Sequence, residues 1–370
     1  MLTIALAAGG LLLLTWVVYP LVMRGLASLT TEASSAAPSM WPKVTAVVAT
    51  REEPSLVEAR VRDLLAADYP ADRLDVVVAI DASRGPAPAD HPAASSCVTV
   101  VRGDAPGGKA AALNAAVRSA TGDVLVFTDT HQRFDAGAVR ALVVALADGK
   151  FGVVSGQLEL PEGRRRSPVE HYWRLERRLR DDEARVGSAI GVSGSIYAMR
   201  HDLWSPLPAG LILDDLYVPM RLILAGHRVG FTSRARAFDA RRTDTEQEFR
   251  RKVRTLTGNF QLCAWLPGVL APWRNPVWAQ FLLHKLLRLL TPWLVLAIGG
   301  TLLGLATSVR GWALPVVLVV AGALVAGSLL SALRVPGVVQ IARWLAMMLA
   351  AVVVATYYGL LGRWDVWPRR

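Results

Sequence analysis

Two neighbouring stretches of the sequence decide the fold: Gly107–Asn114 (GGKAAALN) and Gly122–His131 (GDVLVFTDTH). The first predicts a glycine turn followed by a helix, and the second predicts a short buried strand. Lys109 stands at the start of that helix, where its ammonium group and the free N–H groups of the first turn can meet phosphate. Asp129 follows the strand at its carboxyl end, which is the usual place for chemistry in an open α/β sheet. A lysine for phosphate and a carboxylate for a divalent cation together indicate a nucleoside-diphosphate substrate.

The chain ahead of these stretches repeats a strand–helix–strand pattern. Residues 44–50 form a β-branched run that suits a buried strand, residues 54–67 carry apolar side chains at helical spacing, and residues 74–80 form a second buried strand. Asp81 follows that second strand. Strands joined in this way lie parallel with right-handed crossovers, so we predict an α/β domain over residues 43–245 with a mostly parallel, Rossmann-like sheet.

Apolar residues make up 53% of the sequence and are concentrated near its two ends. Four uncharged runs are each about long enough to cross a bilayer as a helix; they are Ile4–Met23, Leu289–Val309, Gly311–Leu333 and Trp344–Gly362. A cleaved signal peptide is the alternative for the first run, but no positive n-region precedes it, which favours a retained anchor. We therefore predict an anchor over 1–24, a linker over 25–42, an amphipathic interfacial segment over 246–285, transmembrane helices over 286–362 and a tail over 363–370.

The charge of the sequence indicates its partners. With 41 Lys+Arg against 30 Asp+Glu, the formal net charge is +11, which suits anionic lipid or nucleotide phosphates. No segment resembles an RNA- or DNA-binding module, so we expect no nucleic-acid partner. Four spans place residues 24–288 on the cytoplasmic side of the plasma membrane, and the basic residues flanking the spans agree with this in part. Cys97 and Cys263 are too few and too scattered for a disulfide framework or a zinc site, which fits a reducing compartment.

Two further segments carry local signals. Residues 162–185 are heavily charged, and an apolar stripe including Tyr172 and Leu179 predicts an amphipathic helix with a solvated face. A surface against lipid headgroups or an acceptor glycan is the alternative. Gly191–Ser195 is a small-residue turn that either lets a sugar approach the backbone closely or is simply a tight turn.

Five segments, in this order along the chain, resemble those of a known family: VVATREE at 47–53, VAIDAS at 78–83, GGKAAALN at 107–114, FTDTH at 127–131 and LDD at 213–215. The family is the family 2 glycosyltransferases, which are inverting nucleotide-sugar enzymes with the GT-A fold. One segment alone is a weak signal, whereas five in the right order are specific. The resemblance covers residues 44–238 and implies a cytosolic GT-A domain that uses a nucleotide-diphosphate sugar, with a UDP-sugar expected.

By this resemblance Asp215 is the base that deprotonates the acceptor hydroxyl, and Asp214 helps to hold the acceptor or the geometry of the site. Adjacent carboxylates repel each other, which raises one pKa toward the range of a general base. The alternative for Asp214 is a plain helix N-cap. Direct attack by one activated hydroxyl inverts the anomeric configuration, so no covalent sugar–enzyme intermediate is expected.

The strand end Asp129-Thr130-His131 stands where the family usually carries the metal-binding motif Asp-x-Asp. We predict Asp129 and His131 as ligands of Mn²⁺ or Mg²⁺, because imidazole is a reasonable donor for Mn²⁺. The polypeptide N-acetylgalactosaminyltransferases, another branch of GT-A enzymes, use an Asp-x-His of this kind. The alternative is that Asp129 binds the metal alone while His131 packs or points to solvent.

The resemblance also assigns residues to the nucleotide sugar. Thr50, Glu53 and Asp81 fall on the nucleoside side, while Lys109 and Asp129 fall at the diphosphate. A structural cap is the alternative for Glu53 and for Asp81.

Arg251 and Arg254 resemble the (Gln/Arg)-x-x-Arg-Trp motif of processive synthases such as those for cellulose and hyaluronan. Their spacing of three puts both on one helical face, able to grip a diphosphate, although the basic cluster can equally rest on anionic lipid. Thr255 replaces the tryptophan of the motif, which weakens the case for processive polymerisation.

The predicted function is transfer of a sugar to a growing polysaccharide or cell-surface glycan at the membrane. Addition of one sugar to a lipid-linked acceptor is the alternative within the enzyme class, and a non-catalytic glycosyltransferase-like membrane subunit is the alternative outside it. Few C-terminal spans are available for a channel, which leaves room for a homo-oligomer or a partner subunit. A P-loop ATPase fits the spacing from Gly103 to Lys109, but Ala110 replaces the Ser or Thr that holds Mg²⁺ and Pro106 removes an N–H group.

Overall fold

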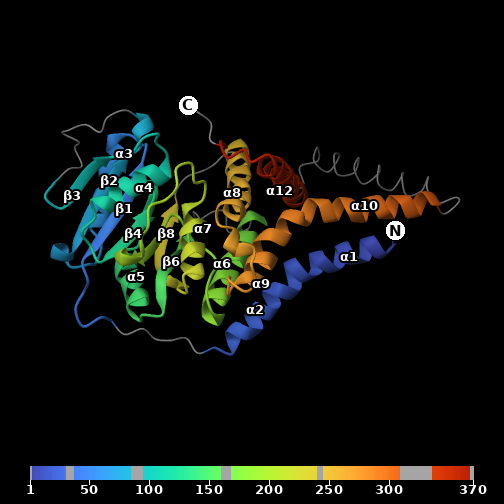
Figure 1. The fold of residues 1–370 in the computed structure, drawn as a ribbon, viewed down its shortest axis with the longest axis horizontal. Helices are drawn as coiled ribbons and strands as arrows, with labels where there is room; N and C mark the ends of the chain where they lie inside the picture. The colour runs from blue at the N-terminus through green and yellow to red at the C-terminus, as the bar shows by residue number, and fades with distance from the viewer. Residues whose placement is uncertain are drawn as a thin grey trace.

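The computed structural model describes residues 2–30, 37–84, 95–159, 168–239, 245–308 and 336–366. One part of the molecule is built around an eight-stranded sheet, and we call this part the sheet domain. The strand order is β3-β2-β1-β4-β7-β6-β8-β5 (Figure 1). The strands are β1 Val44–Thr50, β2 Leu74–Ile80, β3 Val98–Arg102, β4 Val124–Thr128, β5 Gln132–Phe134, β6 Phe151–Glu159, β7 Tyr197–Arg200 and β8 Arg228–Asp239.

The first half of the sheet is parallel, as the sequence predicts. β1 pairs in parallel with both β2 and β4, and β2 pairs in parallel with β3. β1 and β2 have the predicted bounds. Because Thr50, Ile80 and Thr128 end three neighbouring parallel strands, the residues that follow them gather at one edge of the sheet.

The second half of the sheet is mixed, unlike the continuous parallel pattern of the first. β7 is antiparallel to both β4 and β6, whereas β8 is parallel to β6 and antiparallel to β5. The sequence analysis did not predict β5, β6 or β8. In β8 the exposed arginines Arg234 and Arg236 alternate with the buried alanines Ala235 and Ala237, so its hydrophobic signal is weak.

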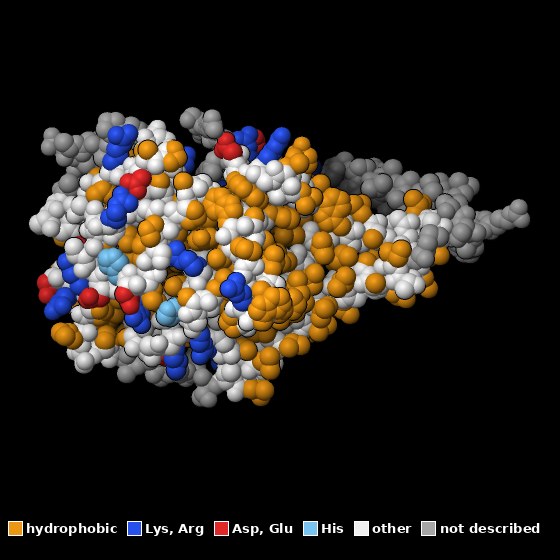
Figure 2. Space-filling view, in the orientation of Figure 1, with side chains coloured by type: hydrophobic (Ala, Val, Ile, Leu, Met, Phe, Trp, Pro, Cys, Tyr) orange, Lys and Arg blue, Asp and Glu red, His pale blue; other side chains and the backbone are white. Residues whose placement is uncertain are grey.

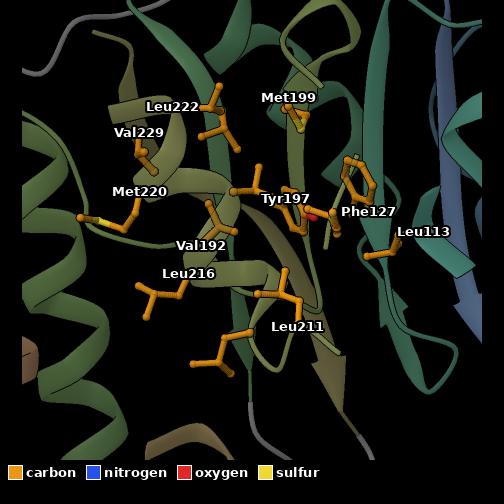
Figure 3. Packing of buried hydrophobic residues seen from close by; sticks show 14 of the residues in the cluster. Leu113, Phe127, Val192, Tyr197, Met199, Leu211, Leu216, Met220, Leu222 and Val229 are labelled. Carbon is orange, nitrogen blue, oxygen red and sulfur yellow. The ribbon is translucent and has the colours of Figure 1, made fainter. Parts of the chain in front are cut away.

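Helices cover both faces of the sheet (Figure 1). α3 (Pro54–Leu65) and α5 (Ala138–Ala147) pack against one face, and α4 (Lys109–Arg118) and α7 (Asp214–Leu224) pack against the other. Alternation along β1 explains how one strand serves both cores, because successive side chains point to opposite faces. Figure 3 shows the core beneath α7, where Phe127 of β4 stacks on Tyr197 of β7 with ring centroids 4.6 Å apart. This stacking holds β4 against β7 in the core on which α7 packs.

The apolar ends of the chain form helices beside the sheet domain. Three of them are long and apolar enough to cross a membrane: Leu2–Ser28, Trp278–Leu305 and Arg343–Leu360. They contain α1 (Leu2–Leu13) and α2 (Tyr19–Ser28), then α9 (Trp278–Phe281) with most of α10 (Thr291–Ser308), then most of α12 (Pro336–Leu360). α1 packs along α10, and both extend away from the sheet with a largely hydrophobic surface (Figures 1 and 2). The predicted span Gly311–Leu333 lies outside the described residues, and the second helix begins ahead of the predicted start at residue 286.

Two long amphipathic helices join these parts: α6 (Pro168–Val186) and α8 (Thr245–Trp265). The helix expected within residues 162–185 is amphipathic and has Leu175 and Arg178 exposed, but several of its charged side chains are not solvated. α6 packs against α2, and its polar side chains Glu176, Asp182 and Glu183 are buried. These three carboxylates instead contact side chains of the apolar helices.

Five of the buried polar residues at this junction form one hydrogen-bonded group, which we call the junction cluster. The Tyr19 hydroxyl donates to Glu183 Oε1 at 2.6 Å, and His284 Nδ1 lies 2.8 Å from the same oxygen. His284 Nε2 lies 3.0 Å from Glu176 Oε2, and Arg288 forms an ion pair with Glu176. Burial alone raises the pKa of Glu176, but His284 and Arg288 outweigh it and hold that pKa well below its ordinary value.

Candidate active site

Four charged side chains meet at the carboxyl edge of the parallel strands, and we call them the edge cluster. Asp129 follows β4, Lys109 begins α4, and Asp214 and Asp215 begin α7. Lys109 Nζ lies 3.1 Å from Asp129 Oδ1 and 3.3 Å from Asp214 Oδ2, so one ammonium group joins two carboxylates from separate elements. Burial alone lowers the pKa of Lys109, but Asp129, Asp214 and Asp215 outweigh it and raise that pKa above its ordinary value. The lysine is therefore a fixed positive charge at the centre of the cluster.

The turn before α4 explains how Lys109 is placed. Gly107 and Gly108 have φ angles of 97° and 94°, a region that favours glycine. The Gly108 N–H donates to Asp81 Oδ1 at 3.0 Å, and a Cβ on Gly107 would lie 2.8 Å from that same oxygen. The two glycines thus let the start of α4 dock on the carboxylate at the end of β2.

Asp81 is one of the residues predicted to contact the nucleoside. Its Oδ1 accepts hydrogen bonds from the backbone N–H groups of Gly108 and Ser83, both at 3.0 Å, and its Oδ2 lies 3.8 Å from Arg51 Nη2. Burial alone raises the pKa of Asp81, but these backbone bonds outweigh it and the pKa is lowered. One oxygen of Asp81 therefore organises the turn, and the other faces Arg51.

Asp214 and Asp215 occupy the first two positions of α7. The N-cap of this helix is Leu213, which makes no side-chain cap hydrogen bond, so the N-cap alternative for Asp214 does not hold. Burial and the neighbouring charge of Asp214 raise the pKa of Asp215 above its ordinary value, against the opposing effect of Lys109. The turn predicted at Gly191–Ser195 lies against this carboxylate, since a Cβ on Gly194 would be 3.3 Å from Asp215 Oδ2.

Asp129 and His131 are the predicted metal ligands. The Asp129 side chain is 36% exposed and pairs with Lys109, which stands where a bound cation would compete for the carboxylate. His131 Nε2 lies 3.1 Å from Glu52 Oε1. Within the described ranges no three His, Cys, Asp or Glu side chains converge to hold a metal. A carboxylate and an imidazole suit Mn²⁺, with the remaining ligands supplied by substrate phosphates, so these residues fit a substrate-dependent metal site.

The other predicted donor residues have structural contacts as well. The Thr50 hydroxyl accepts a hydrogen bond from the Thr130 hydroxyl at 2.8 Å and another from the Glu52 N–H at 3.0 Å. Glu53 is the N-cap residue of α3, but its side chain makes no cap hydrogen bond. Thr50 thereby links the ends of β1 and β4.

Arg251 and Arg254 lie on α8 and differ in their surroundings. Arg251 Nη2 pairs with Glu248 Oε2 at 2.9 Å. Arg254 is brought toward the edge cluster: burial lowers its pKa, while Asp215 and Asp214 oppose that shift. The structure therefore places Arg254, of the two, in the electrostatic field of the edge cluster.

Comparison with known proteins decides the family. Residues 45–204 match the sequence model described as Glycosyl transferase family 2. This part of the chain is a family 2 glycosyltransferase domain. The predicted family and the GT-A α/β fold are thereby confirmed, and the chain is a nucleotide-sugar-dependent glycosyltransferase.

The glycosyltransferase is also similar to solved structures. A mannosyltransferase, PcManGT from Pyrobaculum calidifontis in complex with GDP-Man and Mn²⁺, covers 97% of this chain and 99% of its own, with a TM-score of 0.70 and 23% identity. GalNAc-T7 with UDP, GalNAc and Mn²⁺ covers 56% of this chain and 45% of its own, with a TM-score of 0.43 and 14% identity. No curated protein matches the chain. The first likeness shows that the shared fold includes the apolar helices as well as the sheet domain.

A small pocket adjoins the edge cluster of this glycosyltransferase. Its lining includes Asp215 and four residues that the sequence analysis did not predict as site residues: Arg180, Thr255, Asn259 and Lys285. Lys285 carried a usable signal, because it is a basic residue beside an apolar run. Arg180 carried none, since it is one of many arginines in a charged helix.

Proposed function

We propose that this glycosyltransferase transfers a sugar from a nucleoside-diphosphate sugar to a hydroxyl of a membrane-associated glycan acceptor, with inversion at the anomeric carbon. The observation that carries the proposal is the edge cluster, in which Lys109 joins Asp129 and Asp214 beside Asp215. A fixed cation next to a carboxylate of raised pKa supplies both requirements of the reaction: charge for a departing diphosphate and a base for an attacking hydroxyl.

In the proposed reaction the acceptor hydroxyl gives its proton to Asp215 as its oxygen bonds to the anomeric carbon. The bond from that carbon to the diphosphate oxygen breaks, and its electron pair leaves with the nucleoside diphosphate. Lys109 and Arg254 lie where they stabilise the negative charge that develops on this leaving group. A divalent cation, Mn²⁺ or Mg²⁺, held through Asp129 and His131 would supply further positive charge at the diphosphate.

The nucleotide of the donor is a separate part of the proposal. The sequence favours a UDP-sugar, while the solved neighbour that covers 97% of the chain was obtained with GDP-Man and Mn²⁺. GDP-mannose and the UDP-hexoses are therefore the first donors to compare. Thr50, Glu53, Asp81 and Arg251 are proposed on the nucleotide side.

Three apolar helices adjoin the sheet domain, which supports a reaction at a membrane. We propose the cytoplasmic face of the plasma membrane from the basic residues that flank the predicted spans. The acceptor is a growing polysaccharide or cell-surface glycan, or a lipid-linked acceptor that receives one sugar. A homo-oligomer or a partner subunit would complete a translocation path if the product is a polymer.

A non-catalytic membrane subunit is the second candidate. It is favoured by two observations, the contact of His131 with Glu52 and the threonine at position 255 of the arginine motif. Retention of the whole edge cluster opposes it.

The test is a donor screen with the full chain purified in detergent with Mn²⁺ and membrane lipid. Labelled GDP-, UDP- and TDP-sugars are supplied, and products are separated by size. We expect metal-dependent consumption of one donor, with either a long product or a single-sugar adduct on lipid. No turnover of any donor, in a folded sample, would support the non-catalytic subunit instead.

A further inference from the structure

The pocket beside Asp215 is built where the sheet domain meets the apolar helices. Arg180 comes from α6, Asp215 from α7, Thr255 and Asn259 from α8, and Lys285 from the second apolar helix. Figure 1 shows α6, α7 and α8 converging beside α9, at the base of the membrane-type helices. The pocket therefore lies beside the proposed base, where the sheet domain and the apolar helices meet.

The two cations of this pocket are not neutralised by the carboxylates around them. Four carboxylates of α6 have other partners: Glu176 has His284 and Arg288, Asp181 has Arg185, Asp182 has Arg24, and Glu183 has Tyr19 and His284. The side chains of Arg180 and Lys285 form no ion pair or hydrogen bond with any described residue. Asp215 is the carboxylate that lines the pocket, so positive charge exceeds negative charge there.

Of the two cations, Lys285 gives the stronger indication of a binding site. It lies in the helix Trp278–Leu305, which is apolar enough to cross a membrane. An ionisable side chain in such a helix is costly and usually serves a substrate path. His284 and Arg288 in the same stretch are accounted for by the junction cluster, whereas Lys285 lines the pocket.

Asn259 gives an independent indication that a ligand enters. Its side chain is 4% exposed, and its Nδ2 group donates to the Thr255 carbonyl oxygen at 3.0 Å. Its buried Oδ1 has no hydrogen-bond partner among the described residues. A buried acceptor without a donor costs free energy, and a hydroxyl group entering the pocket would satisfy it.

We propose that Arg180 and Lys285 form an anion site that holds the phosphate of a lipid-phosphate-linked glycan acceptor, beside Asp215 and Asn259. This inference rests on the proposed function and names its acceptor class. A phosphate oxygen is already ionised near neutral pH and needs no base. The presence of Asp215 therefore assigns the attack to a sugar hydroxyl of the acceptor, with the phosphate as the group that is recognised.

The proposed step balances as a single displacement. The acceptor sugar hydroxyl transfers its proton to Asp215, and its oxygen forms the new bond to the anomeric carbon of the donor sugar. The donor's nucleoside diphosphate departs with the electron pair of the broken bond. The acceptor phosphate keeps all its bonds throughout, so it contributes only binding.

The test measures binding of hexyl phosphate to the full chain in neutral detergent, with hexanol as the uncharged probe. We expect hexyl phosphate to bind more tightly than hexanol to the wild type. The affinity should fall about tenfold in Arg180→Gln and in Lys285→Gln, because each removes a charge-assisted hydrogen bond. Arg180→Lys, which keeps the charge, should retain most of the affinity. Arg178→Gln, an exposed position on the same helix, should bind as the wild type does.

Three results would overturn the inference: equal binding of hexyl phosphate and hexanol, unchanged affinity in both glutamine variants, or an equal loss in Arg178→Gln. A separate arm adds saturating GDP or UDP with Mn²⁺. Unchanged binding of hexyl phosphate supports an acceptor site, whereas displacement would assign both cations to the donor diphosphate and contradict the proposal. Because no donor sugar is turned over in these assays, their outcome is independent of the donor screen.

Discussion

The edge cluster and the junction cluster are built from the same kinds of side chain, yet they are paired in different ways. In the junction cluster two buried carboxylates, Glu176 and Glu183, face a histidine, an arginine and a tyrosine hydroxyl. In the edge cluster one lysine faces three carboxylates, and Asp129 remains 36% exposed. In the first group each carboxylate is paired with a histidine, an arginine or a tyrosine hydroxyl. The second group has negative charge left for a cation and a substrate.

This difference separates a structural role from a chemical one. The junction cluster joins α2, α6 and the second apolar helix, so its hydrogen bonds fix the sheet domain on the membrane-type helices. The edge cluster raises the pKa of Asp215, which is a cost to the folded state that a base requires. We therefore expect substitutions in one cluster to affect mainly transfer, and substitutions in the other to affect mainly stability.

The largest expected effect is that of Asp215→Asn on transfer. Loss of a positioned general base lowers the rate by roughly 10²- to 10⁴-fold. The change keeps the side-chain shape and removes repulsion with Asp214, so the unfolding temperature should not fall. Initial rates with the active donor, on samples matched by size-exclusion profile, check this. Near-wild-type transfer in a folded sample would rule out Asp215 as the base.

Glu176→Gln should show the opposite behaviour. It removes the carboxylate that pairs with Arg288, while His284 keeps Glu183. The largely buried charge left on Arg288 lowers the free energy of unfolding by about 3–5 kcal/mol. Chemical unfolding in detergent measures the loss. The matched control is Glu246→Gln, in an exposed pair with Arg250, which should cost less than about 1 kcal/mol. Equal stability losses in the two variants would mean that the junction cluster does not hold the two parts together.

The contribution of Glu176 to stability should also depend on pH. Because the pKa of Glu176 is held below its ordinary value, the stability it contributes is present above the unfolded-state pKa. It is lost as the pH falls through the lower, folded-state pKa. The free energy of unfolding of the wild type should therefore fall with pH in this acid range, and Glu176→Gln should lack that part of the fall. Chemical unfolding at a series of pH values measures both.

His131→Ala should have a smaller effect, confined to the metal requirement. If His131 ligates the cation beside Asp129, the Mn²⁺ concentration for half-maximal transfer rises by roughly tenfold or more. Glu52→Gln separates ligation from the contact with Glu52, since it removes that carboxylate while keeping the imidazole. An unchanged Mn²⁺ titration in His131→Ala would leave Asp129 as the protein's ligand.

The smallest expected effect is a displacement of the acid limb in the pH profile of Asp214→Asn. Asp214 helps to raise the pKa of Asp215, so neutralising it lowers that pKa. Asp215 then stays deprotonated to lower pH, and the acid limb of kcat/KM should move in that direction. A limb that stays in place or moves upward would contradict the proposed coupling.

The sequence allowed half of the fold to be predicted well. β1, β2, β4 and α4 follow directly from buried apolar runs and a glycine turn, and the edge cluster follows because parallel strands end at one edge. The mixed half of the sheet could not be predicted in this way, because β8 mixes arginines with small residues and so carries a weak hydrophobic signal. α6 was predicted as an amphipathic helix whose charged face is solvated. A helix wheel cannot show that Glu176 and Glu183 contact His284, more than a hundred positions away. The positions of Arg180 and Lys285 in the pocket could not be predicted either, because they depend on the same long-range packing.

The most direct test of this account measures transfer and unfolding on the same preparations of wild type, Asp215→Asn and Glu176→Gln. The account predicts that Asp215→Asn keeps the unfolding midpoint and loses transfer. It predicts that Glu176→Gln lowers the midpoint but retains most of the transfer per folded molecule. Loss of transfer in fully folded Glu176→Gln, together with retained transfer in Asp215→Asn, would contradict the assignment of chemistry to the edge cluster.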